Sequence, residues 1–286
     1  MTNDPLLDAL RELARALAPA DIRLIVGGGY GLVLRARHLI ESGARTLRLS
    51  IPPIRATEDI DCFLTTEIII DRTRMASIRA VLDSLGYQPT VKNLQFTRRV
   101  DHEGQSRAIK IDLLAGPVPS DVCELVHIKE MRIRPRGTSG LHAYLTREAI
   151  SIERGLQQLN IAAAGDPVIV ALPHPFTYLL LKLFALRDRL NRGDVAAQKY
   201  HALDLFATWS MLTEPEWEEA QQFGREYQGD MIMTEASGVV AELFAVDTSP
   251  GVIALLGQAL LQGMRIERDV VYAFRHDLAL VFATGR

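Results

Sequence analysis

Two aspartates separated by one residue, Asp59 and Asp61, have the type and spacing to bind a divalent cation. Side chains at positions i and i+2 of a β-strand point to the same face, and the apolar residues 62–64 that follow favour a strand here. Adjacent carboxylates repel each other unless a cation or a proton separates them. Oxygen ligands of this kind suit Mg²⁺, which proteins usually hold with one or two carboxylates plus substrate phosphates. The alternative is that both aspartates are solvated at the end of a strand.

A third carboxylate, Asp112, lies in another predicted strand. Residues 95–100 and 107–114 alternate in polarity, and residues 101–104 between them have the composition of a turn, which predicts a β-hairpin. The apolar neighbours of Asp112 fall on one face of its strand, so its carboxylate points to the other face. A lone aspartate on a strand is commonly a surface residue, and this is the alternative.

Three glycines, Gly27 to Gly29, separate a predicted strand at 22–26 from a predicted helix at 30–40. A glycine turn in this place lets the backbone approach phosphate oxygens, with the N–H groups of the helix directed at them. The run has neither the spacing of a dinucleotide-binding fingerprint nor the Lys-Ser/Thr ending of a P-loop. The alternative is a tight turn that needs glycine for its positive φ.

Arginines at alternate positions mark the predicted extended segment 124–136. By parity, three of them share one face: Arg132, Arg134 and Arg136. They could guide a phosphate-rich substrate. Basic residues and proline also protect the exposed edge of a sheet, so a solvated edge strand explains them equally well.

The C-terminal part is predicted to be helical, and its first helix, 176–190, is apolar but contains charged residues. Lys182 and Arg189 are seven residues apart and therefore lie on one face of that helix. A lysine in an apolar helix needs a partner or a water-filled cleft. The alternative to a functional role is a structural ion pair of Lys182 or Arg189 with Asp204 on the next helix.

These segments predict an α+β protein: a mixed β-sheet with helices, followed by a helical bundle. We expect one domain at residues 1–165 and a helical domain at 166–286. The expected elements are helices at 5–17, 30–40, 72–85, 176–190, 196–212, 215–227, 231–246, 252–262 and 265–283, with strands at 22–26, 59–64, 95–100 and 107–114.

Composition is that of an ordinary globular protein: 286 residues, 48% hydrophobic and 23% charged, with a net charge of −3. Residues 1–150 carry 21 Lys and Arg against 18 Asp and Glu, whereas residues 151–286 carry 11 against 17. This mild asymmetry permits a polyanionic substrate at the N-terminal part. Two cysteines, no basic and apolar leader and no apolar run long enough for a bilayer predict a cytoplasmic protein without membrane segments.

The order of these motifs resembles the nucleotidyltransferase superfamily, whose minimal pattern is a Gly-Gly or Gly-Ser turn, a later Asp-x-Asp and a third carboxylate on a neighbouring strand. Here Gly27-Gly28, Asp59 with Asp61, and Asp112 match that pattern. The resemblance covers about residues 25–205.

The helical part resembles one branch more closely, the AbiEii family of nucleotidyltransferase-like toxins. That family has a Lys-x-x-Ala-x-x-x-Arg helix, matched by Lys182, Ala185 and Arg189, and a following helix with a functional aspartate, matched by Asp204. The family's Arg-Ser/Thr-x-Asp-x-Asp pattern corresponds to the string from Arg55 through Thr57 to Asp61.

The resemblance implies transfer of a nucleoside monophosphate from an NTP to an acceptor hydroxyl, with Mg²⁺ or Mn²⁺ as cofactor. It implies RNA such as a tRNA end as acceptor, and a small antitoxin protein as partner. By the same resemblance, the metal ligands would be Asp59, Asp61 and Asp112, the catalytic set would add Lys182 and Asp204, and the nucleotide would contact Gly27, Gly28, Arg55, Thr57, Lys182 and Arg189. Two alternatives stay open: a small-molecule nucleotidyltransferase of the aminoglycoside-modifying type, and a nucleotide-binding relative without turnover.

Overall fold

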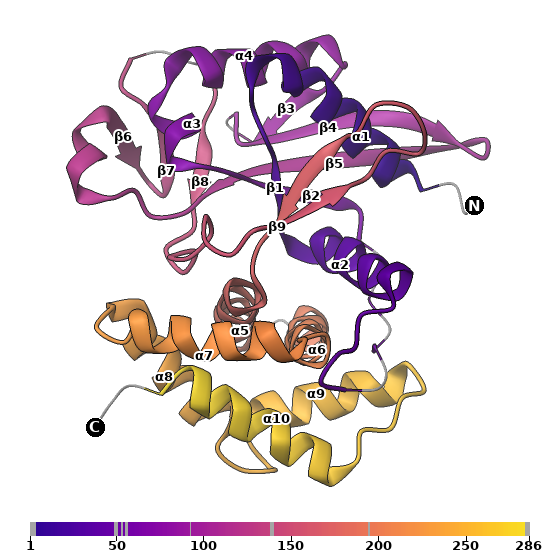
Figure 1. Ribbon diagram of the computed structural model, residues 1–286, viewed down its shortest axis with the longest axis vertical. Helices are drawn as coiled ribbons and strands as arrows, with labels where there is room; N and C mark the ends of the chain where they lie inside the picture. The colour runs from indigo at the N-terminus through magenta and orange to yellow at the C-terminus, as the bar shows by residue number, and fades with distance from the viewer. Residues whose placement is uncertain are drawn as a thin grey trace. The chain divides into compact units, whose positions relative to one another are not determined.

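The computed structural model describes residues 4–48, 51–52, 54, 57–91, 93–137, 140–193 and 195–283, and for 195–199 the backbone alone. Its contacts divide the chain into two compact units (Figure 1). The first unit contains residues 1–35 and 56–174, and the second contains residues 36–55 and 175–286. A mixed sheet with helices followed by a helical part, as the sequence predicts, is therefore confirmed.

The first unit is built on a ten-stranded mixed sheet in the order β6-β7-β8-β5-β2-β1-β10-β9, with β4 pairing with β5 and β3 with β4. The strands are β1 (Ile25–Val26), β2 (Asp59–Leu64), β3 (Gln88–Val91), β4 (Gln95–His102), β5 (Gln105–Ala115), β6 (Val126–Lys129), β7 (Arg132–Pro135), β8 (Ala143–Leu145), β9 (Gln157–Asn160) and β10 (Ile169–Leu172). β2 and β5 are parallel neighbours near the middle of the sheet.

One face of this sheet is covered by helices. These are α1 (Pro5–Leu17), α3 (Thr66–Ile70) and α4 (Arg72–Ser84), with 3₁₀ turns at η1 (Ala18–Ala20) and η2 (Ser120–Leu125). The Asp4 carboxylate starts α1 by accepting from the N–H groups of Leu6 and Leu7, at 3.1 and 3.2 Å. The apolar stripe of α1 then joins a core that includes Ile60 and Ile111 from the two central strands.

Two hairpins depend on backbone with positive φ. Glu103 and Gly104, at φ 54° and 75°, join β4 to β5 as the sequence predicts. The segment predicted as one extended run over 124–136 is instead a second hairpin, β6 and β7, which reverses at Glu130 and Met131 with φ 52° and 60°. Neither residue is a typical one for a positive φ, so the turn has no local signal in the sequence.

The break between the units falls at His174 and Pro175, later than the predicted boundary at 165 and 166. The reason is β10, which pairs in parallel with β1 and belongs to the sheet. Residues 36–55, which include the end of α2 (Gly28–Ser42), belong to the second unit, where the N–H of Leu47 donates to the carbonyl of Leu212 at 2.7 Å.

The second unit is helical. Its helices are α5 (Pro175–Asn191), α6 (Val195–Ser210), α7 (Glu214–Glu226), α8 (Met231–Phe244), α9 (Pro250–Leu261) and α10 (Arg268–Val281). An aromatic cluster joins α6, α8 and α10, in which the ring of Phe274 lies 5.3 to 5.5 Å from those of Phe206, Trp209 and Phe244. In the part of the chain that the structure describes, no helix combines the length and the apolar character needed to span a bilayer.

Candidate functional site on the central strands of the sheet

Asp59 and Asp61 lie on β2 and face away from the helix-covered core. Both are partly buried, whereas the alternating residues Ile60 and Cys62 are completely buried in the core. The period of two thus places both carboxylates on the face of the sheet opposite this core, so they share one face, as the sequence predicts.

Asp112 joins them from the neighbouring strand β5. In the parallel register of the two strands, Asp61 and Asp112 are direct cross-strand partners. Laterally paired residues point to the same face, and neighbouring strands are about 4.8 Å apart, so the two carboxylates are adjacent. The completely buried neighbours of Asp112, Ile111 and Leu113, point into the core. All three predicted carboxylates therefore share one face of one unit.

The glycine turn lies directly against Asp61. The N–H of Gly27 donates to the carbonyl of Asp61 at 2.8 Å. Gly28, at φ +60°, begins α2, and a Cβ added to it would stand 1.7 Å from Oδ2 of Asp61. A Cβ added to Gly27 would stand 2.7 Å from the ring of Phe63. Both glycines are thus needed for close packing, and the positive end of α2 is brought to the carboxylates.

Polar neighbours orient two of the carboxylates. The hydroxyl of Thr57 donates to Oδ1 of Asp59. Nε2 of Gln95 donates to Oδ1 of Asp112 at 2.8 Å. Burial raises the pKa of Asp112, and the charge of Asp59 raises it further, against the opposing effects of the Gln95 hydrogen bond and the Lys110 charge. The carboxylates therefore interact electrostatically, and an added cation would relieve their repulsion.

Gln95 is a site residue that sequence reasoning missed. It is the cross-strand partner of Asp112 in the β4–β5 hairpin. Counting back from the two-residue turn at Glu103 and Gly104 would have found it, because a hairpin's turn fixes its register.

The residues present fit a cation held by one or two carboxylates with other ligands from a substrate. Among the described residues, no group of three or more His, Cys, Asp or Glu side chains is arranged to hold a metal ion by itself. One or two carboxylates plus phosphate oxygens are, however, the usual protein environment of Mg²⁺. Joint ligation by all three aspartates stays a prediction.

Lys182 and Asp204 come together in the second unit. Nζ of Lys182 lies 2.7 Å from Oδ2 of Asp204, with side chains that are 7% and 3% exposed. This is the buried ion pair between α5 and α6 that was the structural alternative for these residues. Arg189 lies in the last turn of α5 and is partly buried. Arg55, the other predicted nucleotide contact, lies outside the described residues.

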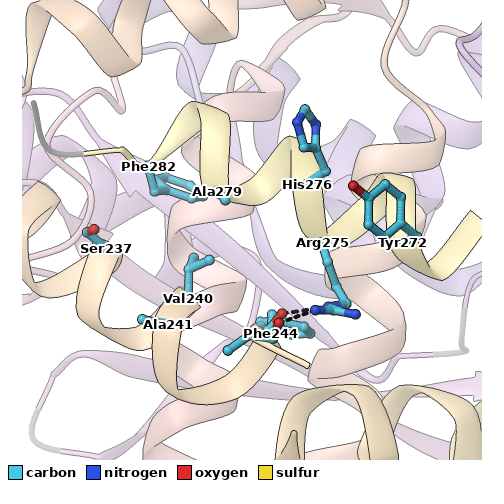
Figure 2. A pocket seen from close by; sticks show the side chains of 10 residues that line it. Ser237, Val240, Ala241, Phe244, Tyr272, Arg275, His276, Ala279 and Phe282 are labelled. Carbon is cyan, nitrogen blue, oxygen red and sulfur yellow. Dashed lines mark hydrogen bonds between the residues drawn. The ribbon is translucent and has the colours of Figure 1, made fainter. Parts of the chain in front are cut away.

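The second unit also contains a pocket of about 310 Å³ between α8 and α10 (Figure 2). The rings of Tyr272 and His276 are stacked 6.3 Å apart at its wall. The guanidinium of Arg275 points to the end of α8, where its Nε donates to the carbonyl of Phe244 at 2.7 Å (Figure 2). Arg275 also pairs with Asp247, so its charge is engaged in holding helix ends together. None of the carboxylates discussed above lines this pocket.

A search of protein-family models, of curated proteins and of solved structures finds no match to this chain.

Proposed function

We propose that this protein is a nucleotidyltransferase that moves a nucleoside monophosphate from an NTP to an acceptor hydroxyl. The observation that supports this function is the pairing of Asp61 with Asp112 across two parallel strands, with the backbone of Gly28 against Asp61. Acidic side chains and a helix N-terminus on one face offer both a cation site and N–H groups for phosphate oxygens. This combination is also the one on which the sequence resemblance rests.

The chain's own groups have distinct tasks in this proposal. Asp59 and Asp61 bind the cation, and Thr57 holds Asp59 in orientation. The N–H groups in the first turn of α2 bind triphosphate oxygens. When bound, Mg²⁺ or Mn²⁺ supplies charge neutralisation for the phosphate oxygens.

Asp112 accepts the proton of the acceptor hydroxyl in this mechanism, and Gln95 positions its carboxylate. The acceptor oxygen forms a bond to the α-phosphorus, the bond between that phosphorus and the bridging oxygen breaks, and pyrophosphate leaves. The role predicted for Lys182 on the triphosphate stays a prediction, since its Nζ is bound to Asp204.

The test is to incubate the purified protein with each labelled NTP, Mg²⁺, and either total RNA or aminoglycosides. We expect the label on RNA with the wild type, and a loss of about 100-fold or more with Asp59→Ala. Asp121→Asn, which removes an exposed carboxylate in η2, is the matched control. Label on a drug would favour the small-molecule enzyme, and NTP binding without transfer would favour the inactive relative. Undiminished transfer by a folded Asp59→Ala protein would refute the site.

We further propose that the enzyme acts as a toxin in the cytoplasm, where NTPs and RNA are found. Adding a nucleotide to the end of an essential RNA would stop translation and growth, and a cognate antitoxin would have to restrain it. Induced expression of the wild type in a bacterial host should arrest growth, and Asp59→Ala should not. Equal growth of the two cultures would argue against a toxin.

A further inference from the structure

The end of the sheet formed by β6, β7 and β8 carries basic residues on the same face as the carboxylates. Leu114, two residues after Asp112 on β5, is the cross-strand partner of Tyr144 on β8. Tyr144 is in turn the partner of Arg132 on β7, and Arg132 is the partner of Lys129 on β6. Because cross-strand partners point to one face, this row of residues continues the face of Asp112 to β6 at the edge of the sheet.

A second row runs beside the first. Arg134 on β7 is the partner of His127 on β6, and parity places both on the same face as Arg132. We call the five residues of the two rows, His127, Lys129, Arg132, Arg134 and Tyr144, the β6–β8 basic face. The opposite face of the three strands packs into the core through Val126, Ile133 and Ala143. These strands, at 126–129, 132–135 and 143–145, contain no Asp or Glu.

The side chains of this face are available to a ligand. The side chains of His127 and Lys129 are exposed, and within the described part of the chain neither side chain has a hydrogen-bond or ionic partner. Within the described part of the chain Arg132 pairs with Glu130, and the side chains are 22% and 62% exposed, so the pair reaches the solvent, where such pairs are weak. Arg134 donates from Nη1 to the carbonyls of Pro135 and Gly137, which leaves other donors of its guanidinium for a ligand.

Protection of a sheet edge explains only part of this face. β6 is the edge strand, so His127 and Lys129 could serve to prevent edge-to-edge pairing. β7 and β8 are paired on both sides, and Arg132, Arg134 and Tyr144 therefore protect no edge. A tyrosine that is 43% exposed beside an arginine on an interior strand calls for another explanation.

We propose that the β6–β8 basic face binds a single strand of RNA and leads its end to the carboxylates. The proposal rests on the function proposed above and identifies the acceptor of that site. The distance across the sheet from Asp112 on β5 to the arginines on β7 is two strand spacings, or about 10 Å, and a few nucleotides can span it. The basic side chains match the phosphates, and Tyr144 offers a stacking surface for an unpaired base.

The experiment measures equilibrium binding of a fluorescent RNA of about 12 nucleotides to the full-length Asp59→Ala protein, in which transfer is blocked. Lys129→Gln with Arg132→Gln should weaken binding by about tenfold or more, and should lower the slope of log K against log salt by about 1.4, or 0.7 for each lost phosphate contact. Tyr144→Ala should weaken binding by about tenfold without changing that slope.

The control removes two other exposed positive charges. Arg15 lies on α1, and Arg107 on β5 has the parity of the core-facing residues of that strand. The double variant Arg15→Gln with Arg107→Gln therefore changes the side of the sheet opposite to the basic face. This variant should bind RNA as the parent does. Tyr144→Ala keeps the test decisive if the Lys129→Gln/Arg132→Gln variant is unstable. Tyr144 is exposed, and its replacement by alanine removes no charge.

The results separate this proposal from the proposed function. If the wild type transfers label and the Lys129→Gln/Arg132→Gln enzyme uses RNA with an unchanged KM, the basic face does not bind the acceptor although the function stands. If the wild type transfers no label to RNA, the proposed function fails, whereas loss of RNA binding in the basic-face variants would still support this surface. Equal weakening by the Arg15→Gln/Arg107→Gln control, tighter binding of DNA of the same sequence, or equal competition by polyglutamate each overturns the assignment to RNA.

Discussion

Asp61 and Asp112 are direct partners in the parallel pair of β2 and β5, and their carboxylates share one face of the sheet. Two like charges at this separation destabilise the fold unless a proton or a cation lies between them. The N-terminus of the helix that begins at Gly28 contributes a partial positive charge beside Asp61. Like charges held this close together by neighbouring strands are typical of a ligand site.

A divalent cation should therefore stabilise the protein. We expect Mg²⁺ or Mn²⁺ to raise the Tm in proportion to the logarithm of its concentration once the site is half-filled, because a ligand that binds only the folded state stabilises it by mass action. Asp61→Asn should abolish the shift, and Asp121→Asn should retain it. Thermal unfolding with EDTA or added metal measures both. An equal shift in wild type and Asp61→Asn would place the cation elsewhere.

Gly28→Ala should remove activity although it adds only one methyl group. The new Cβ would overlap the carboxylate of Asp61, and φ +60° is strained for alanine. We expect transfer to fall by about 100-fold and the free energy of unfolding to fall by about 1–3 kcal/mol. Gly43→Ala is the matched control, because Gly43 has a similar φ of +63° and open space around it. The Gly43→Ala variant should lower the free energy of unfolding, because its backbone is strained, but should keep its transfer activity.

Asp112→Asn should make the protein more stable and less active. Burial and the charge of Asp59 raise the pKa of Asp112 in the folded state, so the folded protein resists ionisation that the unfolded chain undergoes freely. The wild type therefore loses stability relative to Asp112→Asn as pH rises from the usual carboxyl value of 3.8 through the raised pKa, and the difference is constant above it. Urea unfolding in EDTA across this pH range measures the difference. A difference that shrinks with rising pH would contradict the sign.

Local patterns were enough to predict much of the fold. The strand Asp59–Leu64 and the helix Pro5–Leu17 have the predicted bounds, because each is defined by its own periodicity and, for the helix, its own cap and proline. The positions of Asp59, Asp61 and Asp112 on one face also follow from parity once β2 and β5 are neighbours.

What the sequence did not predict depends on contacts between distant segments. β10 is a strand of the first unit because β1 pairs with it, and nothing near Ile169 indicates that partner. The reversal at Glu130 and Met131 uses residues that do not favour a positive φ, so it arises from pairing of the strands on either side. The role of Gln95 likewise appears only when the hairpin register is known.

The buried pair of Lys182 and Asp204 allows a structural role to be tested separately from a catalytic one. Lys182→Met removes the positive charge that lies 2.7 Å from the buried carboxylate of Asp204 and should lower the free energy of unfolding by about 3–5 kcal/mol. Replacing both partners, by Lys182→Met with Asp204→Leu, should cost much less. Arg268→Gln breaks an exposed pair with Asp247 and should cost less than about 1 kcal/mol.

Activity of the same variants gives the second readout. If the folded double variant transfers label at the wild-type rate, the pair serves structure alone. If it folds stably and transfers nothing, Lys182 or Asp204 takes part in the reaction, as the sequence resemblance implies. Measurements well below the Tm of each variant keep the two effects apart.

The two cysteines should report on the integrity of the site without any substrate. Cys62 is completely buried on β2, and burial together with the charges of Asp61 and Asp112 raises its pKa, so its thiol should be inert in the native protein. Cys123 is exposed and should react at once with a thiol reagent. We expect one fast thiol per native chain, two in denaturant, and no fast thiol in Cys123→Ser.

Slow labelling of Cys62 then measures opening of β2, the strand that carries Asp59 and Asp61. A cation that binds these carboxylates must slow this labelling, because it stabilises the closed strand. Gly28→Ala should accelerate the labelling, since the added methyl displaces Asp61. Fast reaction of both thiols in the native protein would mean that β2 is not a stable strand, and the carboxylates on it could not then form a fixed site.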